Sequence, residues 1–135
     1  MRAMKRTARF LKSQFRTVLR KATLSARRNG GEICGLIVDN GYFLELRQVR
    51  NKTRRGGFSF YFGEIRTIQK MARSFNHEIL GTFHSHPKGV AIPGPSDLFN
   101  AVDDSIMLIC DVIGQSASLW HIRGRKSKRL RFVLL

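Results

Sequence analysis

The sequence predicts an α/β fold in which a mixed β-sheet is sandwiched by two or three helices. Two observations support this prediction. Apolar residues recur at helical spacing in two segments, and short apolar segments bounded by turn residues, which are typical of strands, fill most of the remaining chain. With 135 residues the chain can bury a core of its own, and we expect residues 1–135 to form a single domain.

The first half of the chain starts with a basic segment, residues 1–28, which we expect to form a helix. Its apolar residues, among them Phe15 and Leu19, recur near helical spacing, and "RRNGG" after them supplies the positive φ that ends a helix. The elements expected next are a buried strand over 32–38, a hairpin strand over 42–49, a third strand over 58–62 and a helix over 63–75.

The second half of the chain is predicted to hold four strands and one short helix. The first strand, residues 78–86, ends on two histidines, and a proline-rich loop separates it from a helix over 95–101. The remaining strands are expected over 105–113, 117–123 and 129–135.

The net charge of +16 falls into three basic clusters. Residues 1–28 hold ten Lys or Arg and no acidic residue, a second cluster runs from Arg47 to Arg55, and a third runs from Arg123 to Arg131. Such a surface attracts acidic proteins, nucleic acids or phosphate-rich membranes. A solvated face that keeps the protein soluble is the alternative, and charge alone does not choose among these.

The sequence points to the cytoplasm. Its longest apolar run is far shorter than the roughly 20 residues that cross a bilayer, so we expect no membrane span. The basic N-terminus lacks the continuous apolar segment of a secretory signal. Both cysteines, Cys34 and Cys110, lie within apolar stretches, which favours a reduced pair in the core over a disulfide.

The stretch "GTFHSHPKGVAIPGPSD", residues 81–97, is the strongest candidate for a site. Side chains alternate along a strand, so His84 and His86 project from the same face and can both reach one zinc ion. Asp97, in the first turn of the following helix, is placed to supply a third ligand. The alternatives are a structural histidine pair and an acid that only satisfies the helix dipole.

A hydrolytic zinc site also needs a base, and Glu32 is the best candidate among nine acidic residues. It opens the apolar strand "EICGLIV", where a carboxylate has no packing role, and buried acids are rare unless they are paired or functional. The alternative is a strand-end acid in solvent.

These residues resemble the JAMM (MPN+, JAB-domain) family of zinc metalloproteases. "GEICGLIV", "HSHP" and an aspartate eleven residues after the second histidine carry the resemblance. It implies an MPN/JAB-like fold, also described as cytidine-deaminase-like, with His84, His86 and Asp97 as zinc ligands. It further implies that Glu32 is the general base on the zinc-bound water, in an enzyme that cleaves after the tail of a ubiquitin-like protein. E1- and E2-like proteins encoded nearby would be its partners.

The sequence departs from the family at Gly94, where a serine usually helps to stabilise the oxyanion. Losing one such donor costs a factor of about 10² to 10³ in rate. Ser96 lies two residues further on and is a second candidate for a catalytic role. It is equally well explained as an ordinary residue of the helix start.

Two other functions compete with a peptidase. The basic and aromatic stretch over 50–62 is typical of a nucleic-acid-binding module, although Phe58, Phe60 and Phe62 on one strand face would more often be core. We expect no specific nucleic-acid binding. A non-catalytic scaffold that binds a partner is the other alternative, and Gly94 favours it.

Overall fold

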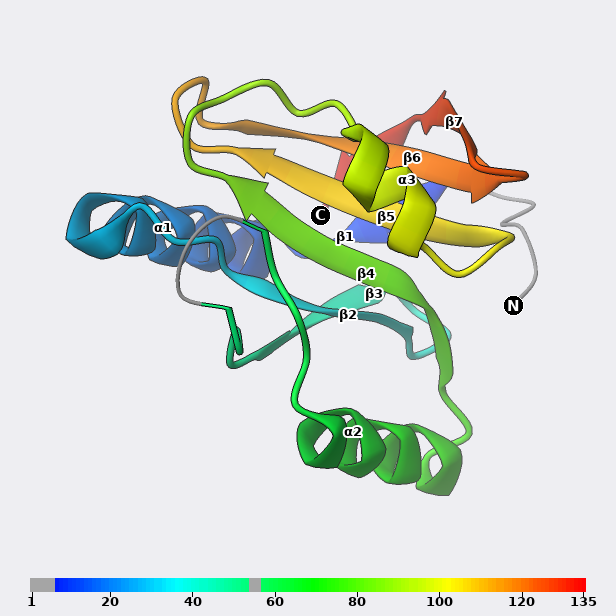
Figure 1. The fold of residues 1–135 in the computed structure, drawn as a ribbon. Helices are drawn as coiled ribbons and strands as arrows, with labels where there is room; N and C mark the ends of the chain where they lie inside the picture. Colours follow the sequence, from blue (N-terminus) through cyan, green and yellow to red (C-terminus); the bar gives the residue numbers. More distant parts are fainter. Residues whose placement is uncertain (1–6, 54–56) are drawn as a thin grey trace.

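A computed structural model describes residues 7–53 and 57–135, which form one eight-stranded sheet and three helices (Figure 1). The strands are β1 (Ala8–Phe10), β2 (Cys34–Asp39), β3 (Leu44–Val49), β4 (Glu78–His86), β5 (Ser105–Asp111), β6 (Ser116–Arg123), β7 (Lys126–Leu130) and β8 (Phe132–Leu134). The helices are α1 (Lys12–Asn29), α2 (Phe62–Ser74) and α3 (Pro95–Asn100). The predicted mixed sheet with two or three helices is confirmed.

The strands lie in the order β7-β6-β5-β4-β2-β3-β1-β8. β4 pairs with β5 in parallel, and β1 is parallel to both β3 and β8. The remaining pairs of neighbouring strands are antiparallel. Because β4 and β5 are parallel, the chain between them must cross back over the sheet, and it does so through the proline-rich loop and α3.

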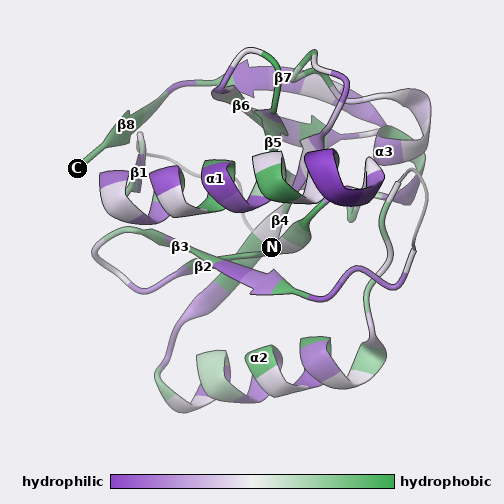
Figure 2. Cartoon of the chain, turned by 90° about the vertical axis from the view of Figure 1, so that its left-hand side faces the viewer, coloured by the Kyte–Doolittle hydropathy of each residue, from purple (hydrophilic) through white to green (hydrophobic). Residues whose placement is uncertain are grey.

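Helices cover both faces of the sheet, because alternate residues of its strands enter different cores. Ile37 and Leu108 pack with the apolar side of α1. Leu36 packs with α2 and Met107 with α3. Both pair with Thr82 in the sheet, so they point to the same face. The molecule therefore has α1 on one face and α2 and α3 on the other. Hydrophilic and hydrophobic residues alternate along α1 and α2 (Figure 2).

The N-terminal helix begins later than the sequence predicts. Ala8 and Phe10 are buried and Arg9 is exposed, which is the alternation of a strand. This short strand, β1, fills the gap between β3 and β8. The helix predicted over 1–28 is therefore wrong for residues 7–11, and the part of the prediction that covers residues 1–6 lies outside the described residues. The predicted C-terminal end of this helix is confirmed, since Gly30 adopts a φ of 67° directly after α1.

The strand predicted over 58–62 is also wrong. Only Phe60 forms a bridge, to Asn51, and Phe62 already begins α2. The segment leaves the sheet because the side chain of Asn51 accepts the backbone N–H of Ser59 in place of a continuing ladder. The rings of Phe58 and Phe60 still lie together, with centroids 5.5 Å apart, whereas Phe62 lies on α2 and is exposed.

The last predicted strand, over 129–135, divides at Arg131 into two strands at opposite edges of the sheet. β7 pairs with β6 and β8 pairs with β1. Since a single residue separates them, the two edges lie close together and the sheet curls. Leu130 and Phe132 accordingly pack against the same core as α1.

Two further expectations concern the cysteines and the membrane. Cys34 and Cys110 are both buried and free, as the sequence predicts. Within the described residues, every helix is too short or too polar to cross a bilayer.

Candidate metal centre

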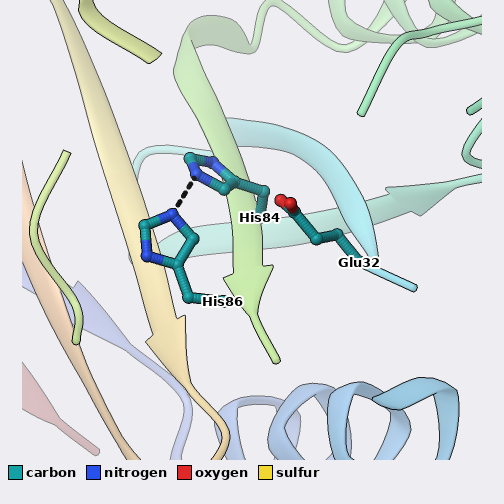
Figure 3. A group of neighbouring side chains, drawn as sticks. All are labelled: Glu32, His84 and His86. Atoms are coloured by element: carbon teal, nitrogen blue, oxygen red, sulfur yellow. Dashed lines mark hydrogen bonds between the residues drawn. The ribbon is translucent and has the colours of Figure 1, made fainter. Parts of the chain in front are cut away.

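The two histidines lie at the carboxyl end of β4. His84 pairs with Cys34 on one side and with Ile109 on the other, which places its side chain on the face covered by α2 and α3. Ser85 points to the opposite face. The Nε2 atoms of His84 and His86 are 3.1 Å apart, and Glu32 points toward the same place (Figure 3). His84 is fully buried, whereas His86 is partly exposed.

Asp97 reaches the histidines from the first turn of α3. Its Oδ1 lies 3.2 Å from Nε2 of His84, and its Oδ2 lies 3.4 Å from Nε2 of His86. The backbone N–H of Gly94 donates to Oδ2 at 2.9 Å, which is the reciprocal bond of a helix start. The helix start therefore fixes the carboxylate that the sequence predicts as the third ligand.

The separations among these three side chains fit a tetrahedral zinc ion. Zinc bonds to nitrogen and oxygen at about 2.0–2.1 Å, which makes each edge of the ligand tetrahedron about 3.3 Å. The three measured edges are 3.1, 3.2 and 3.4 Å. Three protein ligands leave the fourth position open, as hydrolytic zinc sites require.

The outer nitrogen atoms of the two histidines have different surroundings. Nδ1 of His86 donates to the carbonyl of Val90 at 2.7 Å, which leaves the lone pair of Nε2 for a metal. Nδ1 of His84 is buried and has no hydrogen-bond partner among the described residues. The ring of Phe58 holds His84 instead, stacked with a centroid distance of 4.6 Å.

Glu32 lies just before β2, beside the histidines. Glu32, His84 and His86 each offer one possible ligand atom, and these three atoms lie within 4.8 Å of one another. Among the described residues, however, it is Asp97 and not Glu32 that makes ion-pair contacts with the histidines. Asp97 therefore has the geometry expected of a third ligand, and Glu32 lies beside the three side chains. Oε2 of Glu32 accepts the backbone N–H of Gly57 at 2.7 Å.

The two carboxylates differ in their pKa. Burial raises the pKa of Glu32 above its ordinary value, and the nearby histidines and the Gly57 N–H only partly oppose this. Burial also acts to raise the pKa of Asp97, but hydrogen bonds and charge from both histidines outweigh it and hold that pKa well below its usual range. The hydrogen bond to Asp97 in turn raises the pKa of His86.

Cys34 lies beside His84 in the sheet but is a poor metal ligand. Burial, with smaller effects from Glu32 and Glu64, raises the pKa of its thiol to about 12. The thiolate is the form that binds metals, so this residue stays a core thiol at neutral pH.

Ser96 and Gly94 occupy the helix start as predicted. Ser96 is exposed, and its carbonyl accepts the side-chain amide of Asn100. Within the described residues its hydroxyl makes no hydrogen bond to the histidines or carboxylates. At Gly94 a Cβ atom would meet only Oδ2 of Asp97, at 3.6 Å, so the site accepts a serine without displacement.

Sequence reasoning missed several residues that support this centre. They are Asn51, Phe58, Ser85 and Val90, which contact Glu32, Ile33 or the histidines. The only available signal was the position of Ser85 between two candidate ligands. The others approach through a loop whose path the sequence does not reveal.

Two histidines and two carboxylates that converge beside a parallel strand define a candidate hydrolytic metal site on a mixed α/β fold. The chain belongs to the prokaryotic homologs of the JAB domain, whose family model matches residues 15–131. No curated protein matches the chain.

Solved structures share the fold. Protein DSY2949 from Desulfitobacterium hafniense is 22% identical with a TM-score of 0.80, and the match covers 96% of this chain and 93% of that one. A protein from Salinibacter ruber is 14% identical with a TM-score of 0.59, over 100% and 92%. AF2198, a JAB1/MPN domain protein from Archaeoglobus fulgidus, is 15% identical with a TM-score of 0.51, over 98% and 99%. At these identities the likeness establishes the fold alone.

Proposed function

We propose that this protein is a zinc-dependent metallopeptidase that cleaves after the C-terminal tail of a ubiquitin-like protein. The observation that carries the proposal is the position of Glu32, a carboxylate with a raised pKa, beside the triangle formed by His84, His86 and Asp97. Membership of the JAB-domain family supports the same chemistry.

Each residue of the centre has its own role in the proposed reaction. When bound, zinc lowers the pKa of a water molecule toward about 7 and polarises the carbonyl of the scissile bond. His84, His86 and Asp97 would hold the ion. Glu32 accepts the proton of the attacking water and then delivers it to the departing amine. A raised pKa suits this double role, because the group must both take up and release a proton near neutral pH.

The position of the site and the charge of the chain support this substrate. An extended, glycine-rich tail can approach a centre at the end of a strand, and the net charge of +16 favours a partner with an acidic face. We expect the ubiquitin-like protein, and E1- or E2-like enzymes that conjugate it, to be encoded nearby. Two free, buried cysteines suit a reducing cytoplasm.

The decisive experiment compares wild type with Glu32→Gln on ubiquitin-like proteins fused through their tails to a reporter. The amide cannot accept the water's proton, so we expect cleavage to fall by about 10²- to 10⁴-fold while zinc content stays the same. Equal cleavage by both proteins would remove Glu32 from the mechanism.

A non-catalytic binding scaffold is the second candidate, and Gly94 is the observation that favours it. In that case the wild type binds the tail fusion with zinc present and cleaves none of the panel. Binding without turnover in both wild type and Glu32→Gln would establish this alternative.

A further inference from the structure

We propose that Asn51 and Ser85 are positioning residues that hold Glu32 beside the metal centre. The inference rests on the proposed role of Glu32 as the base. Glu32 precedes β2, whose ladder with β4 begins only at Cys34, so sheet pairing does not itself fix the position of this residue. Two side chains from elsewhere in the sequence supply the missing bonds.

Ser85 fixes the backbone on the β4 side. It is fully buried and lies between the two histidine ligands. Its Oγ accepts the backbone N–H of Ile33 at 2.9 Å, and its own N–H donates to the carbonyl of Ile33 at 3.1 Å. The residue next to Glu32 is thus tied to the residue between His84 and His86.

Asn51 fixes Glu32 from the other side. Its Nδ2 donates to the carbonyl of Glu32 at 2.9 Å and to the carbonyl of Gly57 at 3.1 Å. Its Oδ1 accepts the backbone N–H groups of Thr53 and Ser59, at 2.9 and 3.2 Å. One amide side chain therefore satisfies four backbone groups and connects Glu32 to the loop before α2.

These bonds close a ring around the carboxylate. Asn51 holds Gly57, and the N–H of Gly57 donates to Oε2 of Glu32 at 2.7 Å. Both the backbone and the side chain of Glu32 are consequently oriented by Asn51. The N–H of Gly57 takes one acceptor site of Oε2, and Oε1 accepts no hydrogen bond from the described residues. Groups that orient a catalytic side chain in this way commonly change activity by about 10- to 100-fold when they are removed.

The following variants distinguish the loss of the hydrogen bonds that hold Glu32 from a general loss of folding. Asn51→Asp keeps the acceptor for Thr53 and Ser59 but loses the donor to Glu32 and Gly57. Ser85→Ala removes the acceptor for Ile33, and Ser85→Thr restores it. Matched controls are Asn40→Ala, which removes a similar amide that bonds Tyr42, Phe43 and Glu45 in a distant turn, and Ser105→Ala, which removes another buried hydroxyl.

Three readouts are needed. We expect zinc content to be unchanged in every variant, because the ligands are intact. We expect kcat on a tail fusion to fall about 10- to 100-fold in Asn51→Asp and Ser85→Ala, with KM nearly constant and with recovery in Ser85→Thr. Amide exchange followed by NMR should be at least tenfold faster at Gly57 in Asn51→Asp and at Ile33 in Ser85→Ala, and unchanged there in both controls.

Unchanged exchange at Gly57 and Ile33 would overturn the inference, as would a fall in kcat that the two control variants share. If the wild type cleaves no fusion at all, the proposed function fails. The exchange measurements then still decide whether Asn51 and Ser85 hold Glu32, because they need no turnover.

Discussion

Glu32 and Asp97 show how two carboxylates beside the same histidines acquire different pKa values. Both carboxylates are partly buried near the same two histidines, and burial acts to raise the pKa of each. Only Asp97 receives hydrogen bonds from both imidazoles, and these keep it ionised, as a ligand must be. Glu32 keeps a raised pKa, which brings it closer to the working range of a general base.

Zinc occupancy tests this division of roles. We expect purified protein to carry about one zinc per chain, and His84→Ala or Asp97→Ala to lose most of it because each removes one of three ligands. Glu32→Ala should keep it. Elemental analysis of the four proteins provides the measurement, and equal zinc in all of them would remove the assigned ligand set.

Gly94 tests the oxyanion step. Gly94→Ser should fold normally, because serine is a good N-cap and its Cβ contacts only Asp97. If the missing hydroxyl limits the reaction, cleavage should rise by up to about 10²- to 10³-fold. If Ser96 already fills that role, Gly94→Ser should change little and Ser96→Ala should lower cleavage by a similar factor. Steady-state rates of the three proteins distinguish the two cases.

At the scale of elements, the centre depends on the close approach of β4 and β5. Gly81 on β4 allows this approach, since a Cβ atom there would lie 1.7 Å from the carbonyl oxygen of Ile106. The same pairing continues to His84 and His86, so the glycine sets the distance between the histidine strand and the strand that follows α3.

We therefore expect Gly81→Ala to destabilise the fold by about 1–3 kcal/mol or more, because the two strands must separate. Gly63→Ala is the matched control. Gly63 lies in the first turn of α2 with open space around it, so alanine there should be neutral or stabilising by up to about 1 kcal/mol. Urea unfolding of both variants gives the comparison, and equal stability would contradict the packing argument.

The loop before α2 is the second element that shapes the centre. Phe58 stacks on His84 and also contacts Phe60, which packs against α2, whereas Phe62 is 74% exposed. Arg66 covers the exposed ring of Phe62 at 5.0 Å. Among the described residues of this segment, Phe58, Phe60 and Phe62 therefore do not form the continuous exposed aromatic face on which bases would stack.

At the scale of the whole molecule, positive charge dominates the surface. Among the lysine and arginine side chains of the described residues, only Arg47 and Arg50 form ion pairs, with Glu45 and Glu64. The remaining positive charge is available to attract an acidic partner from solution.

Salt dependence separates the possible partners. Binding of an acidic ubiquitin-like tail fusion should weaken as salt rises but persist at physiological ionic strength, because contacts at the centre add to the charge attraction. We expect nucleic acid to be retained only weakly and without sequence preference. Electrophoretic shifts with both ligands measure this. Tight DNA binding with a steep dependence on salt, and without competition from the fusion, would favour the nucleic-acid-binding alternative.

The sequence by itself determined the mixed sheet, most of its strands and which side chains converge at the candidate centre. Alternation along a strand placed His84 and His86 on one face, and the helix start placed Asp97 one loop away, because both are local rules of backbone geometry. The same rules predicted the buried cysteines and the end of α1 at Gly30.

Tertiary structure decided the rest, because long-range pairing overrides local pattern. β1 is a strand where a helix was predicted, because it pairs with β3 and with β8 at the other end of the chain. Phe58 stacks on His84 instead of extending a strand, and the side chain of Asn51 bonds the backbone of the same loop. The bonds of Asn51 and Ser85 to the region of Glu32 span 19 and 52 residues. Contacts at such separations follow from the completed sheet, which no local spacing in the sequence can indicate.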